Sequence, residues 1–172
     1  EMSSDDTIDA IIVSNKAGLV AFKGKVYIDT TGDGDLAAWS GASFKRGYDE
    51  EGSIQMSSLC FSFANIDSYD YINGPTLYVW KDESTPLYKA VRSGKYPLVD
   101  THFCNNLVGP DVIQCNAGHM TVDTTDPWAI SEAMILGRQK AVQYLEAMKD
   151  VRPSTFSNAF VVKTASLLGV RD

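Results

Sequence analysis

Residues 26–39 read Val-Tyr-Ile-Asp-Thr-Thr-Gly-Asp-Gly-Asp-Leu-Ala-Ala-Trp, so that β-forming residues give way to a turn with two glycines and then to helix-forming residues. This order predicts a strand over residues 26–28, a sharp turn, and a short helix from about Asp35. Gly32 and Gly34 have no Cβ, so the backbone there can adopt positive φ or come close to a ligand. The first amide groups of the helix would face whatever lies above the end of the strand.

The residues of this turn permit three interpretations. Gly32, Gly34 and Ala37 have the spacing of the relaxed dinucleotide-binding fingerprint, G-x-G-x-x-A. Asp33 and Asp35, however, place negative charge where a pyrophosphate would bind, and the residues after the turn do not resemble the second strand of a βαβ unit. The second interpretation is a calcium loop, and the third is a purely structural strand-to-helix turn with solvated aspartates.

The calcium interpretation lacks one essential ligand. If Asp29 is the first position of a twelve-residue loop, then Thr31, Asp33 and Gly34 occupy suitable later positions. The twelfth position is Ser40, where such loops require a glutamate that binds through both carboxylate oxygens. We therefore expect no calcium binding tighter than roughly millimolar.

Length and charge exclude several classes of function. The 172 residues can bury a core and form one domain or slightly more, and the net charge is −7. The 15 basic residues form no cluster longer than a pair, so we expect no nucleic-acid partner. No apolar run approaches the roughly 18 residues of a membrane span, so we expect no membrane partner and favour a cytoplasmic location. The oligomeric state is left open.

The three cysteines indicate neither a metal site nor a disulfide framework. Cys60, Cys104 and Cys115 form no C-x-x-C pair, and their odd number argues against complete pairing. Cys60 and Cys115 lie in apolar, strand-like runs, where a buried cysteine usually acts as a small hydrophobic residue. His102 lies near Cys104, but a cysteine nucleophile would need a third, orienting group that the sequence does not identify.

Apolar periodicity and turn residues predict the remaining elements. Strands are expected at residues 10–14, 19–23, 26–28, 58–63, 76–80, 111–116 and 159–165. Gly18 is available for positive φ at the hairpin turn between the first two strands. A proline at the first turn and a glycine beyond the end predict a short helix over residues 86–93. The polar residues 43–53 are expected to form an exposed loop where one domain passes into the next.

A long helix is expected from Pro127 to about Met148. Asp126 is suited to be its N-cap, with Pro127 at the first helical position. Five apolar residues fall on one stripe with a period near 3.6: Ile130, Met134, Ala141, Leu145 and Met148.

Four segments of the chain resemble the FAD-dependent oxidoreductase family. Residues 28–37, Ile-Asp-Thr-Thr-Gly-Asp-Gly-Asp-Leu-Ala, are similar to its IDATGDGDLA segment. Residues 118–128 look like its stretch between a substrate-domain strand and a long helix, residues 135–139 resemble its EGRRQ run, and residues 163–172 resemble its TAPQIGVRE segment. Because the segments follow the family's order over nearly the whole chain, they are more specific together than any one alone.

The resemblance implies an α+β fold with parts of two domains. Residues 1–42 would be the distal part of a Rossmann-like FAD-binding domain. Residues 43–172 would be part of a substrate domain with a mainly antiparallel sheet packed by a long helix. FAD would be the cofactor of the whole protein, and the substrate would be a small molecule. The residues that the resemblance places at the cofactor are Thr31, Gly32, Asp33, Gly34 and Asp35.

Three further residues are candidates to bind substrate. Asn116 and His119 follow a predicted strand, although His119 stands where related proteins often have arginine. Arg171 can bind an anionic group of a substrate or cofactor, or form an ordinary salt bridge. No catalytic residue is indicated.

The chain also departs from the family at both ends. The family's N-terminal βαβ unit, which binds the FAD pyrophosphate, has no counterpart before Glu1, and its C-terminal flavin-contacting segment has none after Asp172. We therefore expect a fragment that binds FAD negligibly and is inactive alone. The alternative class is a non-enzymatic α+β binding domain whose Asp-Gly turn is purely structural.

Overall fold

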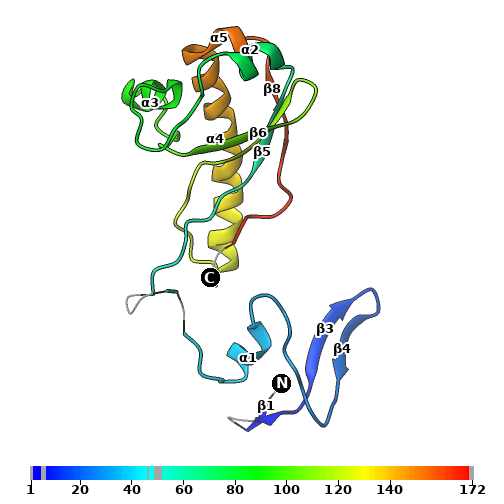
Figure 1. The fold of residues 1–172 in the computed structure, drawn as a ribbon. Coiled ribbons are helices and arrows are strands. Elements are labelled where there is room, and N and C mark those ends of the chain that lie inside the picture. The colour runs from blue at the N-terminus through cyan, green and yellow to red at the C-terminus, as the bar shows by residue number, and fades with distance from the viewer. Residues whose placement is uncertain (1, 5–6, 46, 49–51, 171–172) are drawn as a thin grey trace. The chain divides into compact units, whose positions relative to one another are not determined.

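The computed structural model describes residues 2–4, 7–45, 47–48 and 52–170. They divide into two compact units, unit 1 up to Ile54 and unit 2 from Gln55 (Figure 1). Both units contain strands and helices, and the paired strands run antiparallel. The predicted α+β class is confirmed. Within the described part of the chain, no helix is both long and apolar enough to cross a membrane.

Unit 1 is built from two small antiparallel pairs and one short helix. β1 (Met2–Ser4) pairs with β2 (Thr7–Ile8), and β3 (Ile11–Asn15) pairs with β4 (Gly18–Phe22). Gly18 has a φ of 97°, which confirms both the predicted hairpin and the residue that makes its turn. The short helix is also confirmed as α1 (Asp35–Trp39).

The strand predicted over residues 26–28 is not present. This segment is extended, but it forms no ladder with another described strand, and Val26 and Ile28 are 77% and 80% exposed. It is held instead by Tyr27, whose hydroxyl donates to the carbonyl of Asp9 at 3.0 Å and accepts from the amide of Gly24 at 2.8 Å. β-forming residues favour an extended backbone, but a strand also needs a neighbour with which to exchange hydrogen bonds.

Unit 1 has almost no core of its own. Ala10 is the only described residue of this unit that is buried. The hairpin exposes apolar side chains from both of its strands, among them Ile12, Val13, Leu19 and Phe22.

Unit 2 contains a four-stranded antiparallel sheet in the order β6-β7-β5-β8. Its strands are β5 (Phe61–Ala64), β6 (Phe103–Gly109), β7 (Val112–Ala117) and β8 (Phe160–Thr164). The long helix α4 (Pro127–Val151) lies along one face of the sheet (Figure 1). The predicted antiparallel sheet packed by a long helix is therefore confirmed.

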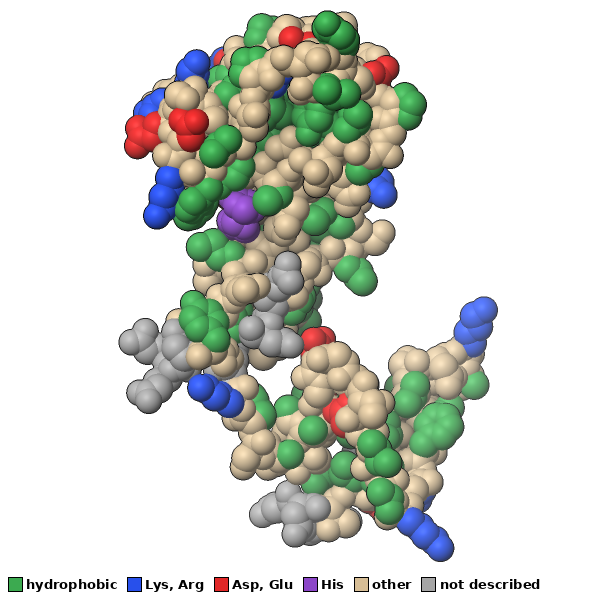
Figure 2. Space-filling model, viewed as in Figure 1, with side chains coloured by type: hydrophobic (Ala, Val, Ile, Leu, Met, Phe, Trp, Pro, Cys, Tyr) green, Lys and Arg blue, Asp and Glu red, His purple; other side chains and the backbone are tan. Residues whose placement is uncertain are grey.

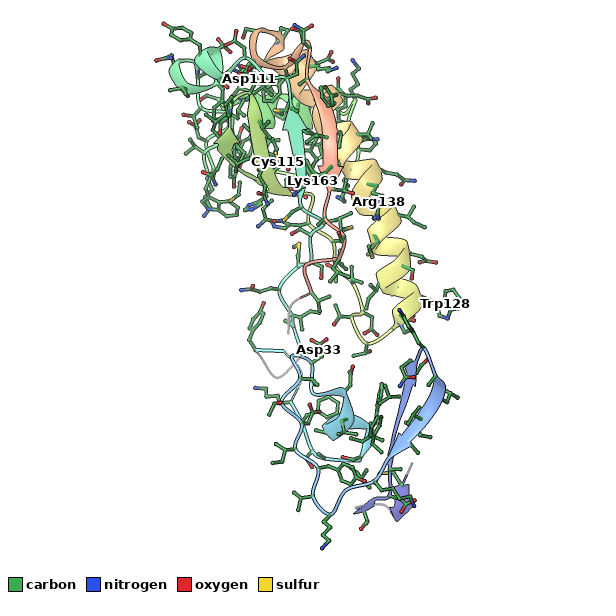
Figure 3. All side chains as sticks on the ribbon, turned by 90° about the vertical axis from the view of Figure 1, so that its right-hand side faces the viewer. Asp33, Asp111, Cys115, Trp128, Arg138 and Lys163 are labelled. Carbon is green, nitrogen blue, oxygen red and sulfur yellow. The ribbon has the colours of Figure 1, made fainter. Side chains whose placement is uncertain are left out.

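The main core of unit 2 lies between this sheet and α4. Phe61 pairs with Cys115 across β5 and β7, and both side chains are almost completely buried. The ring of Tyr144 on α4 stacks on Phe103 with centroids 5.4 Å apart. The opposite side of α4 faces solvent, where Trp128 and Arg138 project away from the sheet (Figure 3).

The N-cap and the apolar stripe predicted for α4 are confirmed. The Asp126 side chain accepts a hydrogen bond from the Trp128 amide at 2.9 Å. The C-terminal members of the stripe are buried in the main core, and Ile130 and Met134 pack on a second cluster around Leu59. A Cβ on Gly137 would lie 2.6 Å from Leu59, so this glycine allows the helix to approach closely.

Three short helices complete unit 2: α2 (Ser68–Asn73), α3 (Pro86–Arg92) and α5 (Pro153–Phe156). α3 confirms the helix predicted after Pro86. The strand predicted over residues 76–80 is wrong, because this segment is a loop from which Leu77 points into the core. β1, β2, β6, α2 and α5 were not predicted.

Candidate functional site

The glycine turn of unit 1 is organised by the carboxylate of Asp29. Its Oδ1 accepts from the amide and the hydroxyl of Thr31, at 2.9 and 2.7 Å. Its Oδ2 accepts from the amide of Ala37, in the first turn of α1, at 3.0 Å. These bonds, led by that from the Thr31 hydroxyl, lower the pKa of Asp29. Asp29 thus replaces the capping side chain that Gly34, the N-cap of α1, does not have.

The two glycines of the turn differ in what the chain itself requires of them. Gly34 has a φ of 65°, a conformation that other residues rarely adopt. Gly32 is outside that region, and a Cβ there would meet no described atom within 4 Å. Neither backbone strain nor packing within the described chain therefore requires glycine at position 32. The space above Gly32 is open to a ligand.

The calcium interpretation competes with these hydrogen bonds. Both carboxylate oxygens of Asp29, the proposed first ligand, are already engaged inside the turn. Nowhere in the described ranges do three His, Cys, Asp or Glu side chains gather in a way that could hold a metal ion. The weak calcium affinity stays a prediction.

In unit 2 the fold brings His119 against His102. The antiparallel ladder pairs Phe103 with Ala117, so the residues just before β6 and just after β7 meet at the same end of the hairpin. The two imidazole rings lie with centroids 4.2 Å apart and planes inclined by 32°. Figure 2 shows the histidine side chains as one patch on the surface of unit 2. We call His102 and His119 the histidine pair.

Asp100 fixes both members of the histidine pair through their backbones. Its Oδ1 accepts from the His102 amide at 2.9 Å, and its Oδ2 accepts from the His119 amide at 2.7 Å. The hydroxyl of Tyr144 lies 2.9 Å from the same Oδ1. One carboxylate therefore joins the two ends of the β6-β7 hairpin to the helix α4.

An aromatic pair, Tyr78 and Tyr88, lies beside His102. The ring of Tyr78 meets it edge-on at 5.7 Å, and Tyr88 stacks on Tyr78 at 6.4 Å. The Tyr78 hydroxyl is buried and has no hydrogen-bond partner among the described residues. Burial, followed by the proximity of His119, lowers the pKa of His102, whereas Asp100 acts in the opposite direction.

The other predicted substrate residues lie elsewhere. Asn116 alternates along β7 with the buried Cys115 and Ala117, so its side chain points to the other face of the sheet. Its Oδ1 accepts from the Ser58 hydroxyl at 2.7 Å, which gives it a structural partner. Arg171 lies outside the described residues. Thr31 to Asp35 all lie in unit 1.

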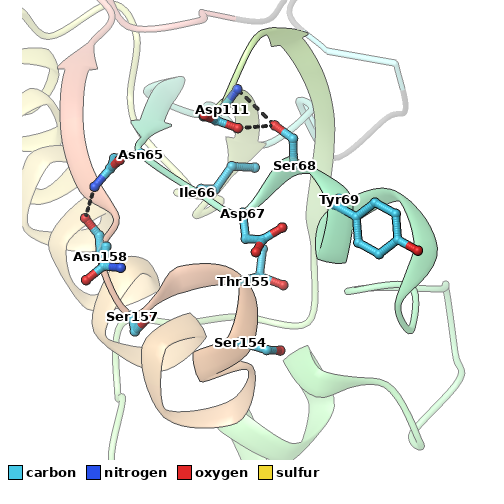
Figure 4. A pocket seen from close by; sticks show the side chains of 10 residues that line it. All are labelled: Asn65, Ile66, Asp67, Ser68, Tyr69, Asp111, Ser154, Thr155, Ser157 and Asn158. Atoms are coloured by element: carbon cyan, nitrogen blue, oxygen red, sulfur yellow. Dashed lines mark hydrogen bonds between the residues drawn. The ribbon is translucent and has the colours of Figure 1, made fainter.

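Two clefts stand out in the described part of unit 2. One, of about 440 Å³, is lined by polar residues at the end of the unit that carries Asp111 (Figures 3 and 4). In this cleft, Oδ1 of Asp111 accepts a hydrogen bond from the Ser68 hydroxyl at 2.6 Å. The other, of about 460 Å³, is lined by residues that include Tyr78, Phe103 and Cys104, and Tyr78 is the lining residue that contacts His102.

Comparison with known proteins gives one decisive result. A model of the FAD dependent oxidoreductase family matches residues 1–172. The chain belongs to this family. No curated protein and no solved structure matched it.

Membership of the family makes FAD the cofactor of the full-length protein, as predicted. The turn of unit 1 fits part of such a molecule, because the backbone at Gly32 and Gly34 is open to close approach. Asp33 and Asp35 would repel a phosphate, but a carboxylate can accept hydrogen bonds from the hydroxyl groups of a sugar or polyol chain.

Proposed function

We propose that this chain forms part of the flavin and substrate sites of an FAD-dependent oxidoreductase that acts on a small molecule. The residues proposed at the cofactor are Thr31, Gly32, Asp33, Gly34 and Asp35. The observation that carries this proposal is Gly32, where an open backbone face has no explanation in the described chain itself. When bound, FAD supplies the redox chemistry, and the protein positions the substrate and adjusts the electronic properties of the flavin.

Unit 2 is proposed to hold the substrate, with His119 as its first candidate. Asp100 holds His119 against His102, and His102 contacts Tyr78 in the wall of a cleft, which is a suitable position for recognising a ligand. Asn116 and Arg171 remain weaker candidates, the first because Ser58 already engages its side chain. The assignment of residues 1–42 to the flavin domain and 43–172 to the substrate domain belongs to the same proposal, as does a cytoplasmic location.

The 172-residue chain by itself is proposed to be inactive. Unit 1 has one buried residue in its described part and exposes apolar side chains along its hairpin, which favours its packing against further chain of the flavin domain. An incompletely packed turn would hold FAD poorly, because cofactor binding depends on a preorganised site.

Flavin content tests this proposal directly. The full-length protein should be purified with flavin at close to one per chain, as measured by its visible absorbance, and the 172-residue chain should be colourless. A stoichiometric flavin spectrum from the 172-residue chain would show that the binding determinants lie within it. A colourless full-length protein that takes up no added FAD would contradict the proposed function.

A further inference from the structure

We propose that the histidine pair, His102 and His119, binds the carboxylate group of an anionic small molecule. That this molecule is the substrate rests on the proposed function. The binding of a carboxylate rests only on the geometry and charge of the pair.

The imidazole groups of the pair are free to bind a ligand. Within the described residues, no hydrogen bond joins either ring to a protein partner, although both side chains are half-buried. Asp100, the nearest carboxylate, uses both of its oxygens on the two backbone amides and the Tyr144 hydroxyl. The backbone is therefore fixed, and the ring nitrogens are left as unused donors and acceptors.

The charges around the pair favour an anion. Asp100 is negative, and its charge is offset by Lys140 on α4, whose ammonium group donates to the carbonyl of Leu98 at 3.0 Å and interacts electrostatically with Asp100. Burial raises the pKa of Tyr78 and of Tyr144, so these two hydroxyls near the pair stay uncharged near pH 7. Protonation of one imidazole therefore gives the site a net positive charge.

The geometry suits a carboxylate better than a metal ion. The two ring centroids lie 4.2 Å apart with their planes inclined by 32°, so one small ligand can contact both imidazoles at once. The described residues also provide no third His, Cys, Asp or Glu ligand for a metal at this position. Two neighbouring imidazoles can instead each donate one N–H to the two oxygens of a single carboxylate.

The adjoining cleft gives the rest of the ligand a place. Tyr78 contacts His102 and also lines the cleft of about 460 Å³, together with apolar residues such as Leu77 and Phe103. The buried hydroxyl of Tyr78, which has no partner among the described residues, can bind a polar group of the ligand. The site thus fits a small carboxylic acid with a partly apolar body.

The chain offers a direct test, because it contains only two histidines and both belong to the pair. Their imidazole carbon-bound protons can be followed by NMR in the 172-residue chain, without flavin, while acetate is added at several pH values. Acetamide, which has nearly the same shape but no charge, is the matched ligand control. Zinc chloride in a third series tests for a metal site.

Acetate should shift both imidazole signals and raise the pKa of His102, and acetamide should do neither. Because binding is linked to one proton, the affinity for acetate should fall about tenfold per pH unit once the pH exceeds the imidazole pKa. His119→Gln should abolish the response of His102 to acetate, and Glu132→Gln, an exposed change on α4, should leave it intact.

Equal shifts with acetate and acetamide would overturn the proposal, as would zinc binding that tightens with rising pH while acetate has no effect. If His119→Gln fails to fold, the comparison of acetate with acetamide in the unaltered chain still decides. Because no flavin is present, failure here is separate from failure of the proposed function, which flavin content measures.

Discussion

The guanidinium of Arg152 is 4% exposed and lies 3.2 Å from the carboxylate of Asp70, which is 82 residues away in the sequence. The same guanidinium donates to the carbonyl oxygens of Asp70 and Pro75, and the hydroxyls of Ser154 and Thr155 donate to the Asp70 carboxylate. A Cβ on Gly74 would overlap this guanidinium. Arg152 therefore fixes α2 and the turn after it onto the corner between α4 and α5.

Arg152→Ala should lower the free energy of unfolding of unit 2 by about 3 kcal/mol. The substitution leaves two carbonyl groups and a carboxylate without their buried donor, and the cost stays at the lower end because the Asp70 side chain is 30% exposed. Urea denaturation followed by circular dichroism measures the change.

Arg92→Ala is the matched control. Arg92 pairs with Glu83 at 2.7 Å, but both side chains are largely exposed, so its loss should cost less than about 1 kcal/mol. Equal effects of the two substitutions would show that the Arg152 network contributes no more than a surface ion pair.

The stability of unit 2 should depend on Asp70 in acid. The Thr155 hydroxyl first, then the Ser154 hydroxyl and Arg152, lower the pKa of Asp70. A carboxyl group whose pKa is lower in the folded state stabilises the folded protein. This stabilisation is complete above the pKa of the unfolded chain, about 4, and is lost as the pH falls through the pKa of the folded state. Urea denaturation between pH 3 and 7 should therefore give a smaller acid loss for Asp70→Asn than for the unaltered chain. If Asp70→Asn and the unaltered chain lost the same free energy of unfolding between pH 7 and pH 3, this role of Asp70 would be contradicted.

The elements that the sequence predicted correctly are those specified by nearby residues. Asp126 and Pro127 mark the start of α4, and Gly18 makes the turn of the β3-β4 hairpin. Such signals act within a few residues, so they can be read without knowledge of the fold.

The missed features depend on pairing between distant residues. Residues 26–28 favour a strand but have no described neighbour to pair with, whereas β6, whose sequence is interrupted by two consecutive asparagines, becomes a strand by pairing with β7. The histidine pair results from that pairing. His102 and His119 lie at equal sequence distances from the turn at Pro110 and Asp111, so a hairpin prediction there would have placed them together. The role of Asp100 has no local signal.

Asp100→Asn should separate the histidine pair. An asparagine can accept through only one side-chain oxygen, so its NH₂ group would face the amide N–H of either His102 or His119. The free energy of unfolding should fall by about 1–3 kcal/mol, which urea denaturation measures. The pKa of His102 should also change, which NMR of the imidazole protons measures.

Asp126→Asn is the control for this change, because asparagine caps a helix about as well as aspartate. It should leave both measurements nearly unchanged. If Asp100→Asn altered stability but not the imidazole signals, Asp100 would support the fold without positioning the histidines.

The glycine turn of unit 1 gives the sharpest test of cofactor contact, because its two glycines are constrained differently. Gly34→Ala should destabilise the 172-residue chain by about 1 kcal/mol or more, since alanine is strained at a φ of 65°. Gly32→Ala should leave its stability nearly unchanged, since the added Cβ meets no described atom within 4 Å and φ is outside the left-handed region. Thermal unfolding of the two variants measures the difference.

In the full-length protein, Gly32→Ala should nevertheless lower the flavin content, because the added methyl group would occupy the space through which the cofactor approaches the backbone. The loss should appear as less flavin absorbance per chain and as partial recovery when FAD is added in excess, which mass action requires of a weakened but intact site. A full flavin content in this variant, with reduced content only in Gly34→Ala, would mean that the turn supports the cofactor site through its shape and does not touch FAD at position 32.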